Sequence, residues 1–188
     1  MSAAFHRYAW GLLLVILDFR LQNFDVLPDV VGYGLVWSAL LQLNQVKAGY
    51  RKAVPWAGLL TVLSIHELVP IAGMPEQGTG ISISWFVYQS VTVILGLLLN
   101  QTFLRQMTQH ALDLSAHSFA TTVDRGRRFV VFSYAAMLIF LPFTINLSPN
   151  LLQGGTIVLA VISIIAMLLL FLLCRDAARA LNRTTPDH

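Results

Sequence analysis

Six long apolar stretches take up most of this chain of 188 residues, and they restrict what it can fold into. A helix needs about 20 residues to cross the hydrocarbon core of a bilayer. Apolar residues make up 56% of the sequence and charged residues 11%, whereas soluble domains average roughly 45–50% and about 25%. We therefore predict an all-α polytopic bundle, one transmembrane domain over residues 1–188. Its six spans are predicted at about 5–24, 30–45, 54–72, 81–99, 129–147 and 156–174.

The 12 Lys and Arg residues fall almost entirely on one side of this topology. That side comprises the two ends of the chain and the connections between spans two and three and between spans four and five. It holds Arg7, Lys47, Arg51, Lys52, Arg105, Arg125, Arg127, Arg128, Arg175, Arg179 and Arg183, which leaves Arg20 for the other side. Cytoplasmic segments of membrane proteins collect these cations. Both termini are therefore predicted to be cytoplasmic. We interpret the net charge of +3 as a consequence of this membrane topology and not as a sign of nucleic-acid binding. The expected partner is the lipid bilayer.

Polar residues gather in the outer half of the predicted bundle. Asp18, Arg20, Asp25 and Asp29 end span one and form the turn after it, and His66 and Glu67 lie near the outer end of span three. On helices, Ser64 shares a face with Glu67, and Gln89 shares one with Ser82, Thr92 and Asn100. An ionisable group within a membrane is a functional hypothesis by default. The pattern predicts an outward-opening cavity for a polar or cationic small molecule.

The predicted ligand-binding residues have separate roles in this cavity. Glu67, with Asp18 and Arg20, would set its charge and orient the solute. His66, Gln89 and Ser64 would add hydrogen bonds, and Asp25 and Asp29 complete the set. A purely structural interpretation is also open, in which Asp18 and Arg20 form an ion pair that ends span one, Asp29 caps span two, and Glu67 neutralises Arg20.

The connection between spans four and five, residues 101–128, has an amphipathic pattern. Phe103, Leu104 and Met107 fall on one side of a helix, and the opposite side carries Gln106, His110, Asp113 and His117. We predict a cytoplasmic helix over about residues 101–119, either on the membrane surface or continuing span four. A metal bound by His110, Asp113 and His117, at positions i, i+3 and i+7, is an alternative. We expect neither a metal nor a cofactor, because any amphipathic helix has such a polar face.

Two other functions stay open. The first is an accessory subunit of a larger membrane complex, or a homo-oligomer, which would pack through the small residues Gly34 and Ser38 on span two. The second is an intramembrane enzyme that uses the carboxylates of Asp18, Asp25, Asp29 and Glu67. The sequence has no complete catalytic motif, so a non-enzymatic role is favoured. Span six is the most uniformly apolar, and we expect it to face lipid.

The stretch from Leu17 to Tyr33, LDFRLQNFDVLPDVVGY, resembles the first outer turn of a family of small bacterial membrane proteins of similar length. This resemblance implies the inner membrane of a bacterium and no particular activity. The architecture is also similar to the substrate-binding components of energy-coupling-factor vitamin transporters. These have six helices, both ends inside, and an outward pocket capped by the first outer loop. Their Ala-x-x-x-Ala docking motif is missing from span one, where Ala4 and Ala9 are five residues apart.

Overall fold

The computed structural model describes residues 2–16, 20–21, 24–25, 29–65 and 83–181. Regular structure in this part of the chain is helical apart from one antiparallel pair of two-residue strands, β1 (Arg20–Leu21) and β2 (Phe24–Asp25). One helix corresponds to each predicted apolar stretch: α1 (Ser2–Ile16), α2 (Asp29–Val46), α3 (Val54–Ser64), α4 (Ile83–Asp113), α5 (His117–Phe140) and α6 (Pro149–Ala180). The short 3-10 helices η1 (Ala48–Lys52) and η3 (Leu141–Ile145) follow α2 and α5.

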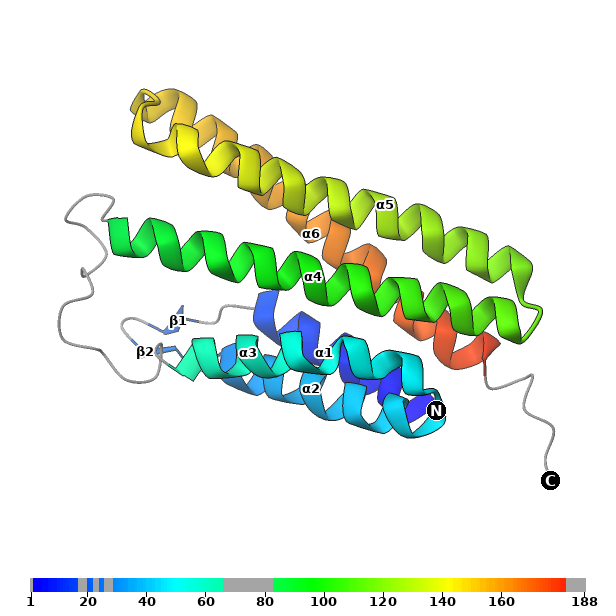
Figure 1. Ribbon diagram of the computed structural model, residues 1–188. Coiled ribbons are helices and arrows are strands. Elements are labelled where there is room, and N and C mark those ends of the chain that lie inside the picture. The colour runs from blue at the N-terminus through cyan, green and yellow to red at the C-terminus, as the bar shows by residue number, and fades with distance from the viewer. Residues whose placement is uncertain (1, 17–19, 22–23, 26–28, 66–82, 182–188) are drawn as a thin grey trace.

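The six helices form a closed ring of contacts, and Figure 1 shows the bundle from the side. Each helix packs against the next along the chain, and α6 returns to pack against α1. Successive helices run in opposite directions, so the connections alternate between the two ends of the bundle. One end carries Ser2, η1, the turn between α4 and α5, and Leu181, and we call it the termini end. The opposite end carries β1, β2 and η3, and we call it the open end.

Aromatic side chains fill the ring near the termini end. The rings of Tyr8 on α1 and Phe103 on α4 are stacked with centroids 3.8 Å apart. Phe5 and Tyr50 complete the cluster, with ring centroids 6.3 Å apart in an edge-to-face arrangement. All four side chains are fully buried. Such pairs stabilise a fold by about 0.5–1.5 kcal/mol beyond the area they bury, so this end of the bundle has a packed core.

Helices α1 and α2 approach each other through two glycines. A Cβ at Gly32 would lie 2.8 Å from the carbonyl oxygen of Gly11, and a Cβ at Gly11 would lie 2.7 Å from that of Gly32. Small residues allow helix backbones to come this close. Gly34 takes no part in this contact, because a Cβ there would meet nothing within 4 Å; packing of Gly34 and Ser38 against a partner stays a prediction.

Two predicted boundaries differ in the structure. Helix α1 ends at Ile16, and the chain is extended at Arg20–Leu21 and Phe24–Asp25, so the first stretch is not one helix to residue 24. Of the two arrangements predicted for residues 101–119, the structure has the continuation of the fourth helix: α4 runs unbroken to Asp113, and α5 begins at His117. The predicted polar face of this segment is also wrong in part, because Gln106 and His110 are buried against the ring.

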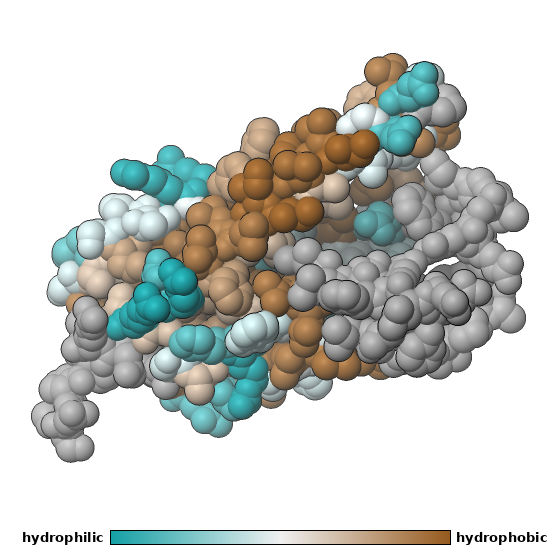
Figure 2. All heavy atoms as spheres, turned by 180° about the vertical axis from the view of Figure 1, so that it is seen from behind, coloured by the Kyte–Doolittle hydropathy of each residue, from teal (hydrophilic) through white to brown (hydrophobic). Residues whose placement is uncertain are grey.

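Among the residues that the structure describes, three helical segments are long and apolar enough to cross a membrane: Phe86–Asp113, His117–Ile145 and Asn150–Ala180. The described part of α3 covers only about 16 Å at 1.5 Å per residue, roughly half of a hydrocarbon core. Helix α2 is longer but carries Asp29, Gln42, Asn44 and Gln45. Seen from behind, hydrophobic atoms form a band between hydrophilic groups at the two ends of the bundle (Figure 2).

Candidate functional site

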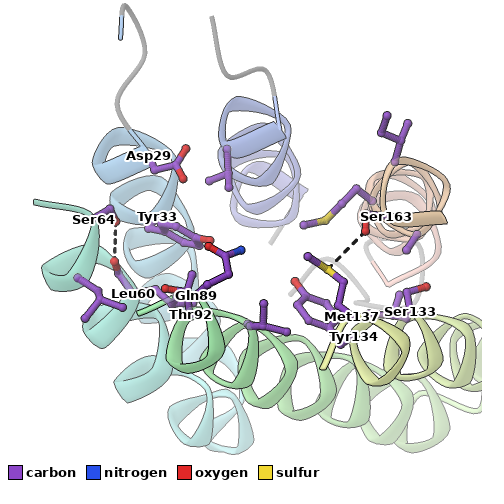
Figure 3. A pocket seen from close by; sticks show the side chains of 18 of the residues that line it. Asp29, Tyr33, Leu60, Ser64, Gln89, Thr92, Ser133, Tyr134, Met137 and Ser163 are labelled. Carbon is purple, nitrogen blue, oxygen red and sulfur yellow. Dashed lines mark hydrogen bonds between the residues drawn. The ribbon is translucent and has the colours of Figure 1, made fainter. Parts of the chain in front are cut away.

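A cavity of about 350 Å³ lies inside the ring toward the open end. All six helices contribute to its wall (Figure 3): Val15 on α1, Asp29 and Tyr33 on α2, Leu60, Leu63 and Ser64 on α3, Tyr88, Gln89, Thr92, Val93 and Gly96 on α4, Val130, Ser133, Tyr134 and Met137 on α5, and Ser163, Ile164, Ala166 and Met167 on α6. Ligand sites in helical bundles commonly form between helices in this way. The ring is therefore packed in one half and hollow in the other.

The wall formed by α2, α3 and α4 is the more polar one. Asp29 and Tyr33 lie one helical turn apart on α2, and Gln89 and Thr92 lie three residues apart on α4, so each pair shares a helix face. Ser64 ends α3 and is buried. In Figure 3 these side chains lie together on one side of the cavity, with Tyr33 directed toward Gln89.

Three hydroxyl groups in the wall donate their protons to the backbone of their own helices. The Ser64 hydroxyl donates to the Leu60 carbonyl oxygen at 2.6 Å, and that of Thr92 to the Tyr88 carbonyl at 3.0 Å. The Ser133 hydroxyl likewise donates to the Phe129 carbonyl at 2.9 Å. A hydroxyl has one proton to donate and two lone pairs that accept. These three oxygens can therefore still accept hydrogen bonds from a bound molecule.

A buried amide group lies at the boundary between the cavity and the packed core. The side-chain nitrogen of Asn100 donates to the Tyr134 hydroxyl at 3.0 Å and to the Gly96 carbonyl at 2.9 Å. Its oxygen accepts a hydrogen bond from the Tyr8 hydroxyl at 3.3 Å. The side chain of Tyr134 packs closely over Gly96, where a Cβ would lie 2.8 Å from the ring. Asn100 thus connects a cavity residue, Tyr134, to the aromatic cluster of the termini end.

The wall formed by α1, α5 and α6 is the more apolar one. Met137 and Met167 contribute thioether groups, and Val15, Val130, Ile164 and Ala166 contribute aliphatic groups. The Ser163 hydroxyl donates to the Met137 sulfur at 3.6 Å, which ties α6 to α5 beside the cavity. Methionine side chains adapt their shape and contact aromatic rings favourably. This side of the cavity suits the apolar part of a ligand.

The structure brings together three of the eight predicted ligand-binding residues: Asp29, Ser64 and Gln89 all line the cavity. Arg20 and Asp25 are opposite each other in the β1–β2 pair at the open end, as backbone partners. Asp18, His66 and Glu67 lie outside the described residues. On α4, the predicted polar face is present in Gln89 and Thr92, which line the cavity, and in Asn100, which is buried beneath it.

The three residues considered as metal ligands do not meet in the structure. The Asp113 carboxylate is paired with the ammonium group of Lys47, and His110 Nδ1 lies 3.3 Å from the Tyr50 hydroxyl. His117 belongs to the next helix, because α4 ends before it. Within the described part of the chain, no group of three or more His, Cys, Asp or Glu side chains is placed to hold a metal ion.

Sequence reasoning missed the contribution of α5 and α6. Ser133, Tyr134, Met137, Ser163 and Met167 line the cavity, so one side of α6 faces the cavity. None of these residues carries a charge at neutral pH, so the ionisable groups of the sequence do not indicate them. The available signal was spacing: Ser133 and Met137, and Ser163 and Met167, each lie four residues apart, on one face of their helix.

No protein-family model, curated protein or solved structure matches this chain.

Proposed function

We propose that this chain is a six-span protein of a bacterial inner membrane that binds, or helps to transport, a small polar solute in the cavity at its open end. The observation that carries the proposal is the cavity itself, which all six helices line at the end of the bundle opposite the two termini. A volume of about 350 Å³ falls within the range of roughly 300–1,000 Å³ for small-molecule sites.

The surface of α6 supports a membrane location. Exposed apolar side chains run from Leu151 to Leu172, a stretch about 33 Å long at 1.5 Å per residue. That length is close to the roughly 30 Å of a hydrocarbon core. Arg175 and Arg179 follow directly, at the termini end. This order supports a location of the apolar belt of α6 in the membrane, with its last turns in water.

The distribution of basic residues supports an outward-facing cavity. Lys47, Arg51 and Lys52 lie in or beside η1, and Arg125, Arg127 and Arg128 lie in the first half of α5, which starts at the termini end. Cytoplasmic segments are enriched in such residues, so the termini end would be cytoplasmic and the open end would face outward. The predicted roles of an accessory subunit and of a carboxylate enzyme stay alternatives.

The proposal is tested by comparing two substitutions of glutamine on one helix. Gln89 lines the cavity, whereas Gln101 is exposed and lies further along α4. The purified protein is screened for metabolites that raise its thermal unfolding temperature. We expect Gln89→Leu to bind a stabilising metabolite about tenfold more weakly, which corresponds to about 1.4 kcal/mol of binding free energy. The leucine side chain keeps the bulk of glutamine but loses its hydrogen bonds. Gln101→Leu is expected to bind as the wild type does.

Equal binding of the metabolite by wild type and Gln89→Leu would exclude the cavity as its binding site. The variant Glu67→Gln, measured in the same assay, tests the residue that the sequence favours most. Unchanged stabilisation in that variant would exclude Glu67 from the site and leave the cavity in place.

A further inference from the structure

We infer that the solute is an organic amine, with a protonated nitrogen at one end and an apolar body at the other; this inference rests on the proposed function. The first observation is the charge of the wall. Among the lining residues that the structure describes, Asp29 supplies a carboxylate, and there is no Lys, Arg or His. An anionic ligand would therefore meet no cationic side chain in the described wall of the cavity.

The second observation is the direction of the hydrogen bonds. Ser64, Thr92 and Ser133 line the cavity and donate their protons to carbonyl groups of their own helices, so their oxygens keep only lone pairs for a bound molecule. A carboxylate or phosphate in a ligand can only accept hydrogen bonds, so these oxygens would not bind it. A protonated amine offers up to three N–H donors, and an ammonium group taken out of water needs such acceptors.

The third observation is the rest of the lining. Tyr33, Tyr88 and Tyr134 place aromatic rings around the cavity, and Met137 and Met167 place sulfur atoms on its more apolar side. The faces of aromatic rings attract cations, most strongly where water is excluded. The arrangement in Figure 3, with the polar side chains of α2 and α4 facing the apolar ones of α5 and α6, matches a molecule with two unlike ends.

Three probes with one carbon skeleton test the inference: 4-phenylbutylamine, 4-phenylbutanol and 4-phenylbutyrate, which are cationic, neutral and anionic at neutral pH. Binding to the purified full-length protein in detergent is measured by titration calorimetry, and the heat of titration into the same detergent without protein is subtracted to remove partition into micelles. We expect the amine to bind at least tenfold more tightly than the alcohol, and the carboxylate to bind more weakly than either.

Asp29→Asn then tests the carboxylate while keeping a side chain of the same shape in the first turn of α2. We expect this variant to bind the amine at least fivefold more weakly and the alcohol unchanged. Asp176→Asn, at an exposed carboxylate near the termini end, is the matched control and should bind all three probes as the wild type does.

The outcomes separate the two proposals. If the alcohol or the carboxylate binds as tightly as the amine, and Gln89→Leu weakens that binding, the preference for an amine is wrong and the cavity remains a binding site. If Asp29→Asn binds the amine as the wild type does, the inference fails in the same way. If none of the probes binds the wild type more tightly than Gln89→Leu, this inference is contradicted, and the metabolite screen with Gln89→Leu and Gln101→Leu decides the proposed function separately.

Discussion

At the scale of single residues, Asn100 has the most consequential position in the bundle. Its side chain is buried and holds the hydroxyl groups of Tyr8 and Tyr134 from either side. An asparagine amide has an acceptor and two donors, and a buried tyrosine hydroxyl needs a partner. The Asn100 side chain provides a hydrogen-bond partner for both tyrosine hydroxyl groups. It therefore fixes the ring of Tyr134, which forms part of the cavity wall, to the packed core around Tyr8.

We expect Asn100→Leu to lower the free energy of unfolding by about 1–3 kcal/mol, because the Tyr8 hydroxyl loses its partner in an apolar surrounding. Thermal unfolding of the purified protein, followed by tryptophan fluorescence, measures the change. Asn146→Leu is the control, since Asn146 is exposed at the end of η3. Equal unfolding temperatures for the two variants would show that the amide bonds of Asn100 contribute little to stability.

At the scale of elements, the glycines decide how closely the helices approach. Gly11 and Gly32 allow the backbones of α1 and α2 to touch, and Gly96 allows the Tyr134 ring of α5 to lie against α4. At each of these glycines, a neighbouring group occupies the space that a side chain would otherwise fill. Rigid packing leaves little room for an added methyl group in such places. The separation of the helices, and with it the width of the cavity, depends on these positions.

Two glycines on α2 make a matched test of this packing. In Gly32→Ala the new Cβ would lie 2.6 Å from Val15 Cγ2 and 2.8 Å from the carbonyl oxygen of Gly11, so α1 and α2 must move apart. We expect a loss of about 1–3 kcal/mol in the free energy of unfolding. Gly34→Ala, two residues along the same helix, meets nothing within 4 Å and is expected to lose no stability, because alanine is favoured over glycine inside a helix by about 0.5–1 kcal/mol. A similar loss in both variants would attribute the effect to the helix and not to its contact with α1.

At the scale of the whole molecule, the ring separates two chemically different ends. The termini end holds the aromatic core and most of the basic residues, and the open end holds the cavity. A six-helix ring with an even number of antiparallel passes puts Ser2 and Leu181 at the same end of the bundle; that this end is cytoplasmic stays a prediction from the Lys and Arg distribution. The proposed function requires one orientation of this ring in the membrane, and that orientation can be measured directly.

Cysteine labelling measures that orientation. The native Cys174 is buried, and Cys174→Ala provides a background without thiols. On this background we introduce Asn146→Cys at the open end and Thr121→Cys near the start of α5, both at exposed positions. In intact cells, a charged maleimide that does not cross the inner membrane is expected to label residue 146 and not residue 121. Labelling of both, or of residue 121 alone, would contradict the proposed topology.

The sequence by itself determined the helices and much of one cavity wall. Apolar stretches located all six helices, because burial in a membrane or a bundle requires long runs of apolar residues. The spacing of Gln89 and Thr92, and the positions of Asp29 and Ser64, indicated side chains that meet at one depth. Length and direction along each helix follow from local pattern alone, so these expectations could be made without a structure.

Only the tertiary structure decided how each helix is rotated about its axis and how closely it approaches its neighbours. Ser163 and Met167 of the apolar α6 face the cavity, and Gln106 and His110 of a polar helix face are buried. The close approach of Gly11 to Gly32, and not the small residues at Gly34 and Ser38, joins α1 to α2. Rotation and spacing depend on the fit of side chains on two surfaces far apart in the sequence. The sequence pattern of one helix describes only one of the two surfaces that must fit together.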